Sequence, residues 1–296
     1  MNLLPLLLSC AARDLPELPS WTWVAPEVSA GTLTMAVTGR GRSRARASYT
    51  GGGGELLDFV GYAFVHEHPE HGVLVIDPGY PSLAEDPSVY PGRFLANVTG
   101  LSEVAPLVGQ LSAAGLAAAD VDRLLITHGH VDHAGAIADF PGATLHVVER
   151  EWDFARKRDP LHAVIPEPYV DHEAVELLTF DGGPYGPFPS HHDLYGDGSV
   201  IVLPTPGHTP GHSSVLVNLP ESSWLLVGDA AWLERHWAEP TPKGRMTQAL
   251  LEDDPGAAWL ALARIHAWAE ANPELRVMAG HEPQLEVRYP TLPASL

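Results

Sequence analysis

The 296-residue sequence has only one cysteine, Cys10. A single thiol cannot form an internal disulfide, and it cannot supply the several thiolates that a cysteine-rich zinc site or an iron–sulfur cluster needs. Basic residues are also few, with 17 Lys and Arg against 37 Asp and Glu, which gives a formal net charge of −20 when histidine is neutral. A field of this sign repels phosphate backbones, so the composition argues against nucleic acid as a partner.

Long apolar runs are absent as well, since no stretch approaches the roughly 20 apolar residues of a membrane-spanning helix. The N-terminus, MNLLPLLLSC, has a short apolar stretch that ends at Cys10 and is similar to the end of a bacterial lipoprotein signal, in which the cysteine carries lipid. No Lys or Arg precedes this short stretch, which favours an apolar terminus packed on the protein. We therefore expect a cytoplasmic protein, with an exported lipoprotein attached at Cys10 as the alternative.

Hydrophobic residues make up 45% of the chain, which is enough to bury a core. We expect an N-terminal extension over residues 1–30 and a single domain over residues 31–296. Apolar runs predict strands at 62–66, 73–76, 124–127, 144–148, 200–203, 214–219, 224–227 and 276–278, and helical patterns predict helices at 102–114, 150–157 and 254–271. This order predicts an α/β domain with mixed sheets covered by helices.

Two segments are predicted to be irregular. Residues 39–54 carry Arg40, Arg42, Arg44 and Arg46 before four glycines, and we interpret them as a solvated surface hairpin or loop, or as an arm that attracts anions. Residues 181–198 are rich in Gly and Pro and contain aromatic residues, which suits either a lid over a site or a packed surface loop.

The strongest chemical signal is the run HGHVDH, which holds His128, His130, Asp132 and His133 directly after an expected strand. Imidazole and carboxylate groups are ligands that suit zinc, manganese or iron. At spacing two, His128 and His130 can point the same way, whereas Asp132 and His133 face elsewhere and could serve a second ion. The alternative is a polar loop of hydrogen-bonded histidines, but a chance match to this pattern arises on the order of a few times per thousand chains. The run therefore favours a metal site.

Three further motifs place a polar side chain beside glycine at the end of an expected strand. They are PGHTPGH with His208 and His212, GD with Asp229, and GHE with His281. Each motif alone is weak, because a lone His or Asp after a strand is usually a turn residue. Their shared placement predicts that they gather along one rim of the domain.

Taken in order, HGHVDH, PGHTPGH, GD and GH resemble the metallo-β-lactamase superfamily of metal-dependent hydrolases, over about residues 62–283. The resemblance implies a four-layer αββα sandwich of two mixed β-sheets, with two divalent metal ions at one rim, zinc first and Mn, Fe or Co as alternatives. It implies that His128, His130 and His208 hold the first ion, that Asp132, His133 and His281 hold the second, and that Asp229 bridges the two. Asp77 matches an Asp-x-Gly motif that braces the ligand histidines, and His212 is expected to support the site without binding metal.

Details within the superfamily point away from β-lactam cleavage. Lactamases that use a thiolate need a cysteine ligand, and other lactamases lack the bridging aspartate. In having a bridging carboxylate, the sequence resembles glyoxalase II, acyl-homoserine lactonases and organophosphate hydrolases. Lactonases of this kind place a tyrosine three residues after that aspartate, where this sequence has Trp232. We expect Trp232 to contact the substrate or to lie beside the ligands, and Tyr80, Tyr90 or Tyr185 could take the place of the tyrosine.

The predicted function is a dinuclear hydrolase that uses a metal-bridging hydroxide to cleave an ester, lactone or related acyl bond, with Asp132 or Asp229 moving the proton. Aromatic residues at 80–94, 181–198 and 232–237 predict a pocket for a small molecule with an apolar acyl or aryl portion. Two alternatives stay open, a mononuclear-iron enzyme resembling persulfide dioxygenases and a metal-stabilised binding protein without catalysis. The sequence leaves the oligomeric state open.

Overall fold

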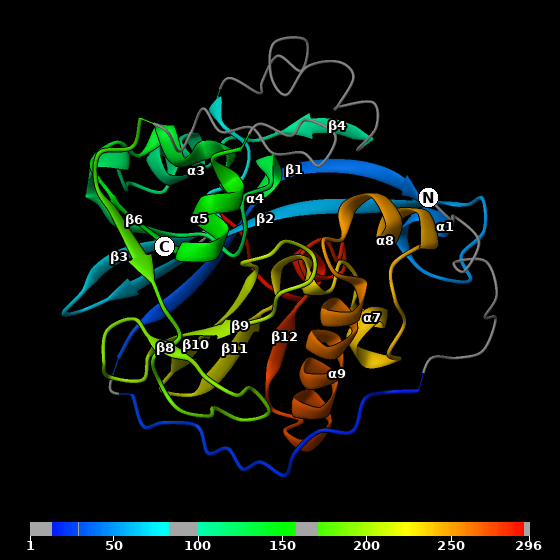
Figure 1. Cartoon of the computed structure of the whole chain (residues 1–296). Coiled ribbons are helices and arrows are strands. Elements are labelled where there is room, and N and C mark those ends of the chain that lie inside the picture. The colour runs from blue at the N-terminus through cyan, green and yellow to red at the C-terminus, as the bar shows by residue number, and fades with distance from the viewer. Residues whose placement is uncertain (1–13, 29, 83–99, 158–170, 293–296) are drawn as a thin grey trace.

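The computed structural model describes residues 14–28, 30–82, 100–157 and 171–292. In this part of the chain, two β-sheets pack against each other, and helices lie on their outer faces (Figure 1). The first sheet has seven described strands in the order β4-β1-β2-β3-β5-β6-β7, and the second has five in the order β12-β11-β10-β9-β8. Both sheets contain parallel and antiparallel pairs. The expected four-layer αββα sandwich of two mixed sheets is confirmed.

The strands of the first sheet are β1 (Thr32–Arg44), β2 (Leu56–His68), β3 (Gly72–Ile76), β4 (Leu101–Val104), β5 (Val121–Leu125), β6 (Thr144–Val148) and β7 (Val175–Leu178). Those of the second sheet are β8 (His192–Asp193), β9 (Val200–Pro204), β10 (Ser213–Leu219), β11 (Ser222–Leu226) and β12 (Arg276–Met278). The α-helices are α1 (Ala45–Ser48), α3 (Leu107–Ala113), α4 (Val131–Ala134), α5 (Glu149–Ala155), α7 (Glu234–Ala238), α8 (Arg245–Leu251), α9 (Pro255–Ala271) and α10 (Leu285–Arg288). Short 3-10 turns are η2 (Ala118–Asp120), η3 (Gly135–Asp139) and η5 (Gly228–Ala230).

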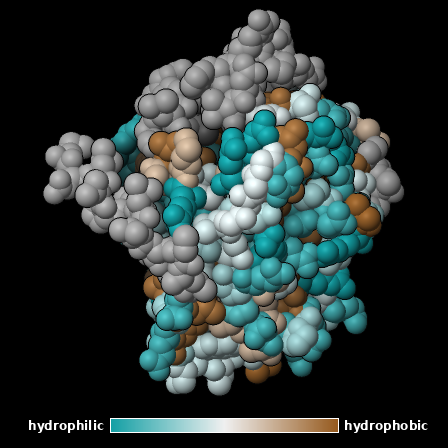
Figure 2. All heavy atoms as spheres, turned by 90° about the vertical axis from the view of Figure 1, so that its right-hand side faces the viewer, coloured by the Kyte–Doolittle hydropathy of each residue, from teal (hydrophilic) through white to brown (hydrophobic). Residues whose placement is uncertain are grey.

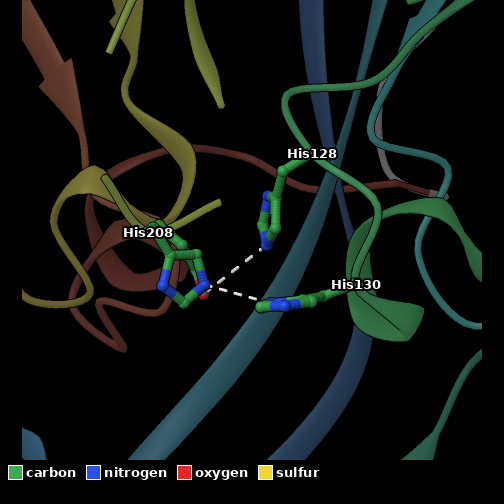
Figure 3. A group of neighbouring side chains, drawn as sticks. His128, His130 and His208 are labelled. Atoms are coloured by element: carbon green, nitrogen blue, oxygen red, sulfur yellow. Dashed lines mark hydrogen bonds and ion pairs between the residues drawn. The ribbon is translucent and has the colours of Figure 1, made fainter. Parts of the chain in front are cut away.

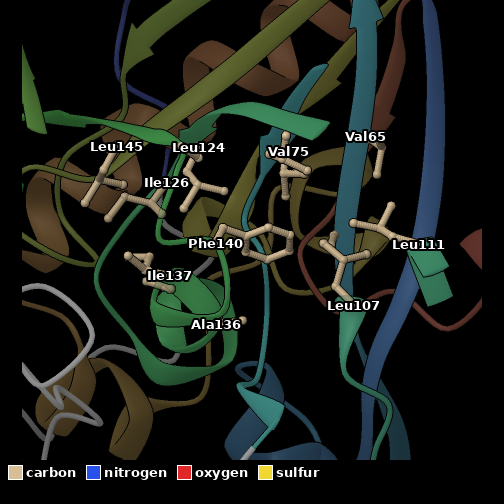
Figure 4. Close-up of a cluster of buried hydrophobic side chains, with 14 of the residues drawn as sticks. Val65, Val75, Leu107, Leu111, Leu124, Ile126, Ala136, Ile137, Phe140 and Leu145 are labelled. Carbon is tan, nitrogen blue, oxygen red and sulfur yellow. The ribbon is translucent and has the colours of Figure 1, made fainter. Parts of the chain in front are cut away.

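The central strands are apolar on both faces because each face packs against another layer. Val75 and Leu124 join Leu107 and Leu111 of α3 in a buried cluster between the first sheet and its helices (Figure 4). Their strand neighbours, such as Leu125, point the other way into the cluster between the two sheets. This alternation explains why the strands read as continuous apolar runs in the sequence.

The longest helix of the described residues, α9, covers the outer face of the second sheet (Figure 1). It begins where the sequence predicts, because the Asp254 side chain accepts hydrogen bonds from the backbone N–H groups of Gly256 and Ala257. Trp268, which is fully buried, anchors the helix against this sheet. The cluster between α9 and the second sheet is the third buried cluster of the sandwich, the α9 core.

The described N-terminal segment, residues 14–28, runs past the end of α9 (Figure 1). Trp23 meets Trp268 edge to face with ring centroids 5.1 Å apart, and the Trp259 indole N–H donates to the Asp14 carbonyl at 3.1 Å. This segment therefore packs on the α9 core. Cys10 lies outside the described residues, and no helix among them is long and apolar enough to cross a membrane.

The arginine-rich segment is part of a hairpin and not a free loop. Arg40, Arg42 and Arg44 belong to β1, which pairs with β2 along its length, and α1 lies at the tip. Arg40 makes two hydrogen bonds to Glu286, and the Arg42 guanidinium lies 2.8 Å from Asp58. The pairing of β1 with β2 confirms the hairpin interpretation, and two of the four arginines are already paired with acidic side chains.

The helix predicted at 102–114 is wrong in its first part. Residues Leu101–Val104 form β4 at the edge of the first sheet, and α3 begins only at Leu107. Pro106 accounts for the break, because a proline disfavours the helical conformation of the residue before it. The predicted start signal at Ser102 lies in a strand, where its hydroxyl donates to the Arg40 carbonyl at 3.1 Å.

The segment 181–198 is a packed surface loop and not a lid. Phe188 is buried, and its ring lies 5.7 Å from that of Trp268, while Tyr185 lies 6.1 Å from the same ring. These aromatic side chains contribute to the α9 core and are not available as pocket walls. The face of the molecule in Figure 2 is mostly hydrophilic, with hydrophobic residues in small scattered groups, in keeping with the acidic composition.

Candidate metal centre

The polar motifs meet at one edge of the sandwich, where four strands end. His128 and His130 follow β5, His208 follows β9, Asp229 lies in η5 after β11, and His281 follows β12. The structure thus brings together motifs that lie more than a hundred residues apart, at one rim as expected. All five side chains are buried.

The first group of possible ligands is His128, His130, His208 and Asp229, each of which offers one atom within 4.8 Å of the others. His208 Nε2 lies 3.0 Å from His130 Nδ1 and 2.9 Å from Asp229 Oδ2. Figure 3 shows three imidazole rings that converge from two segments, His128 and His130 from the loop after β5 and His208 from the loop after β9. Four ligand atoms at this spacing can surround a single ion.

The second group is Asp132, His133 and His281, whose ligand atoms also lie within 4.8 Å of one another. Asp229 Oδ1 lies 3.2 Å from His133 Nε2 and 3.1 Å from His281 Nε2. The Asp229 carboxylate therefore stands between the groups, with Oδ2 toward the first and Oδ1 toward the second. This geometry suits a carboxylate that bridges two ions.

Buried atoms without partners test whether the residues fit a metal. His128 Nε2, His133 Nε2 and Asp229 Oδ1 are buried and make no hydrogen bond. Buried polar atoms are nearly always hydrogen-bonded, so several exceptions in one place call for an explanation. Imidazole nitrogen and carboxylate oxygen are ligands of divalent transition metals, and ions at this place would use these atoms.

The ring orientations also fit metal binding. His128 Nδ1 lies 3.1 Å from the Thr127 hydroxyl, His133 Nδ1 lies 2.8 Å from Asp77 Oδ2, and His281 Nδ1 lies 3.2 Å from the Val60 carbonyl. Each contact places the ring proton on Nδ1 and leaves the Nε2 lone pair facing the centre. Hydrogen bonds of this kind fix the tautomer and the direction of metal-binding histidines.

Asp77 braces both the loop and a ring, as the resemblance implies. Its carboxylate accepts from the backbone N–H and the hydroxyl of Thr127, each at 2.7 Å, and from His133 Nδ1. Its φ of 52° is a left-handed conformation that non-glycine residues rarely adopt. A strained residue held by several hydrogen bonds typically serves a functional site.

The charges of the two groups differ. Burial lowers the pKa of His128 and His208 well below its usual value and that of His130 to about 4, so these rings are neutral near pH 7 and can bind a metal. Burial also opposes a charge on His133. The nearby carboxylates, of which Asp229 has the largest effect, outweigh burial and raise the pKa of His133. The second group therefore favours a positive charge at its centre.

His212 has no free ring nitrogen. Its Nε2 accepts from the Asp229 backbone N–H at 3.0 Å, and its Nδ1 lies 2.9 Å from the Thr205 hydroxyl. Burial lowers its pKa to about 3, which keeps the ring neutral. In this structure, His212 holds the main chain at Asp229.

Trp232 lies beside the possible ligands, where its indole N–H donates to Asp229 Oδ2 at 2.7 Å. Its ring centroid lies 6.4 Å from that of His208 and 6.0 Å from that of His281. Of the tyrosines that could replace the missing one, Tyr185 packs against Trp268 and Tyr80 is buried beside Gly39. Tyr90 lies outside the described residues.

Glu151 supports the centre, although no motif in the sequence marks it. Its carboxylate accepts from the Gly129 N–H at 2.7 Å, the Thr209 hydroxyl at 2.6 Å and the Gly211 N–H at 3.0 Å. A Cβ on Gly211 would lie 2.1 Å from the Glu151 nitrogen, so this approach requires glycine. Glu151 thus joins the two loops that carry His128, His130 and His208. Nothing in the run EREW distinguishes it from the exposed Glu149.

Lys243 is the second residue that the sequence did not reveal. It is buried, and its Nζ donates to the Asp229 carbonyl and to Glu252 Oε1, the latter at 3.1 Å. Its Nζ also lies 5.2 Å from the centre of the Trp232 ring. A lysine in the segment PTPKG carries no sequence signal for burial, because its partners come from other parts of the chain.

Glu282, which follows the last histidine motif, ties its loop to the start of α7. Its carboxylate accepts from the Glu234 N–H at 2.9 Å and from the Gln284 N–H at 3.0 Å. It makes these contacts while buried.

In a further group of possible ligands, His68 and His71 at the β2–β3 turn meet Asp197 of the loop between β8 and β9. His68 Nδ1 accepts from the backbone N–H groups of Glu70 and His71, so the proton lies on Nε2, which faces Asp197 Oδ2 at 3.2 Å. A protonated nitrogen has no lone pair for a metal. This group is a hydrogen-bonded surface cluster.

Comparison with known proteins agrees with the geometry. The family model of the metallo-beta-lactamase superfamily matches residues 56–281. The chain is 32% identical over 190 residues to the N-acyl homoserine lactonase AttM of Agrobacterium fabrum. The aligned region covers 63% of this chain and 67% of that protein.

Two solved structures have the same fold. The first is an N-acyl homoserine lactone hydrolase with N-hexanoyl-L-homoserine at its catalytic metal centre, with a TM-score of 0.70 and 22% identity over 88% of this chain and 96% of that one. The second is AidC, a dizinc quorum-quenching lactonase, with a TM-score of 0.65 and 16% identity over 94% of each chain.

The relatives support the predicted metal-dependent hydrolase and neither of its two alternatives. The match covers most of the described chain and includes every motif that meets at the rim. The chain belongs to the metallo-beta-lactamase superfamily.

Proposed function

We propose that this protein is a dinuclear lactonase that opens the ring of N-acyl homoserine lactones. The observation that carries the proposal is the placement of the Asp229 carboxylate between two groups of histidines at one rim. The family relatives named N-acyl homoserine lactonase support the choice of substrate.

In this proposal, His128, His130 and His208 hold one ion, Asp132, His133 and His281 hold the other, and Asp229 bridges them. Zinc is the proposed metal, as in the dizinc lactonase of the same fold, and Mn, Fe and Co are alternatives. When bound, the ions supply Lewis acidity, which activates water near neutral pH and polarises the ester carbonyl. Every other step falls to side chains of this chain.

Asp132 is the residue proposed to move the proton. Its side chain is 23% exposed, whereas that of Asp229 is 4% exposed and faces ring nitrogens and the Trp232 N–H. A carboxylate must reach both water and substrate to act as a base and then as an acid. Asp132 would take the proton that the attacking water loses and return it to the leaving ring oxygen. Asp229 would bind both ions and keep them in place relative to each other.

Phe59 is proposed to contact the apolar acyl chain of the substrate. Its partly exposed ring lies 5.4 Å from that of His281 and 5.6 Å from that of Trp232, measured between centroids. An apolar surface next to polar, reactive groups is typical of a site for small amphipathic molecules. The proposed substrate combines a polar lactone with such a chain.

The test combines metal analysis with hydrolysis on the same zinc-loaded preparation. Ring opening of N-hexanoyl-homoserine lactone releases an acid, which a pH indicator follows continuously. We expect two ions per chain and lactone cleavage, both lost in Asp132→Ala or His208→Ala chains that keep the folded circular dichroism spectrum. Two bound ions with cleavage only of a thioester, phosphotriester or γ-lactam would refute the substrate. A single iron ion would favour the mononuclear alternative.

A further inference from the structure

Trp232 is not one of the possible metal ligands, yet its indole N–H donates to the central carboxylate of Asp229. We propose that Trp232 is a positioning residue that orients Asp229 between the two ligand groups and so raises the affinity of the first group for its ion. This inference rests on the proposed function, because it assigns Asp229 the bridging place. Its basis is the hydrogen bond from the indole N–H to Asp229 Oδ2 at 2.7 Å.

The hydrogen bond acts on one oxygen only. Oδ2 faces His208 Nε2 at 2.9 Å and His128 Nε2 at 3.8 Å, which belong to the first group. Oδ1, toward the second group, makes no hydrogen bond. A donor on Oδ2 therefore fixes the rotation of the carboxylate and aims each oxygen at a different group.

The remaining neighbours of Asp229 cannot replace this donor. Its backbone N–H donates to His212 and its carbonyl accepts from Lys243, so the main chain is held but the carboxylate can still rotate. Among the described residues, the other side chains paired with its carboxylate are histidines of the possible ligand set, which face it through ring nitrogens. A nitrogen that binds an ion cannot donate, so the indole N–H would be the hydrogen bond that remains on the carboxylate.

The indole is held firmly enough to serve this role. Trp232 is only 9% exposed, and the Phe59 ring meets it edge-on at 84° with the centroids 5.6 Å apart. On the main chain, the Trp232 carbonyl accepts from the His281 N–H at 2.8 Å. Because indole has a single donor and Asp229 uses it, Trp232 has no proton left for a substrate carbonyl.

The test compares Trp232→Phe with the matched control Trp224→Phe. The Trp224 indole also donates one hydrogen bond, to the Ser222 hydroxyl at 2.9 Å, but its ring packs on Tyr289. Zinc affinity is measured by competition with a chromophoric chelator, and absorption spectra are recorded with Co²⁺ in place of zinc. Loss of partners that orient ligands typically costs 10–100-fold in metal affinity. We expect a loss of about this size in at least one binding step for Trp232→Phe, with a changed cobalt spectrum, and neither effect for Trp224→Phe.

Unchanged or tighter zinc binding in Trp232→Phe, or an equal loss in both variants, overturns the inference. A wild-type chain that binds two ions without cleaving lactones refutes the proposed substrate and leaves this inference standing.

A second measurement needs neither metal nor a stable variant. In the metal-free wild-type chain, the indole N–H of Trp232 should exchange slowly with solvent in ¹⁵N-resolved NMR spectra, because it is buried and bonded. Fast exchange of that proton would overturn the proposed hydrogen bond.

Discussion

Glu151 offers the sharpest test of how the ligand loops are held. The change Glu151→Gln keeps the shape of the side chain but replaces one acceptor oxygen with an NH₂ group. Three donors point at this carboxylate, from Gly129, Thr209 and Gly211, and the single oxygen of glutamine cannot serve both ends. Each buried donor left without a partner costs about 1–3 kcal/mol. At about pH 8, where Glu151 is ionised, Glu151→Gln should therefore unfold more easily than the wild-type chain by about this amount.

The difference in unfolding free energy between wild type and Glu151→Gln should also depend on pH, and the structure gives the sign. Burial raises the pKa of Glu151 from its ordinary value of 4.5 to about 7. The three hydrogen bonds that it accepts favour the charged form and oppose this rise, but burial outweighs them. When folding raises the pKa of an acid, the folded state binds the proton more tightly than the unfolded state. The resulting stabilisation is complete below the pKa of the unfolded state, and it is lost as the pH rises through the pKa of the folded state. From about pH 8 to about pH 4.5, the advantage of wild type over Glu151→Gln should grow by about 3 kcal/mol.

The assay is urea unfolding of the metal-free chains followed by circular dichroism across this pH range. Groups that both chains share cancel in the difference. Glu149→Gln is the matched control, since Glu149 lies on the same helix turn but is exposed, and it should change stability by less than about 0.5 kcal/mol. A difference between wild type and Glu151→Gln that stays constant with pH would refute the reasoning.

Three further outcomes are expected. Asp77→Asn removes an acceptor that Thr127 and His133 share, so zinc affinity should fall about 10–100-fold in a chelator competition, and an unchanged affinity would contradict the bracing role. Phe59→Ala should raise KM for a decanoyl lactone more than for a butanoyl lactone in steady-state kinetics, and equal effects on both would separate Phe59 from the acyl chain. Removal of metal by a chelator should lower the midpoint of thermal unfolding in calorimetry, with recovery on adding zinc, and an unmoved midpoint would argue against metal binding at the rim.

The sequence predicts the centre better than it predicts its surroundings. The seven proposed ligands lie in short motifs that directly follow strands, and local pattern is enough to place His128 or Asp229 at a strand end. Glu151 and Lys243 act through partners far away in the chain, and neither their type nor their flanking residues reveal that contact. Their roles depend on tertiary structure alone.

The fold shows the same division. The apolar runs predict the central strands, because both faces of those strands are buried. The sequence does not indicate strand β1, because its Arg-Gly-Arg-Ser-Arg alternation resembles a solvated segment. Pairing with β2 and with Glu286 makes it part of the sheet. At β4, edge pairing with β1 and the break at Pro106 outweigh the helical pattern.

Each of the two ligand groups draws its residues from both sheets, and this affects the stability of the chain as well as its chemistry. His128, His130, Asp132 and His133 follow a strand of the first sheet, whereas His208 and His281 follow strands of the second. Each ion would therefore act as a cross-link between the two halves of the sandwich. An ion at a thousand times its Kd adds about 4 kcal/mol to the stability of the chain. Metal supply would then set the lifetime of the protein against proteolysis as well as its turnover of substrate.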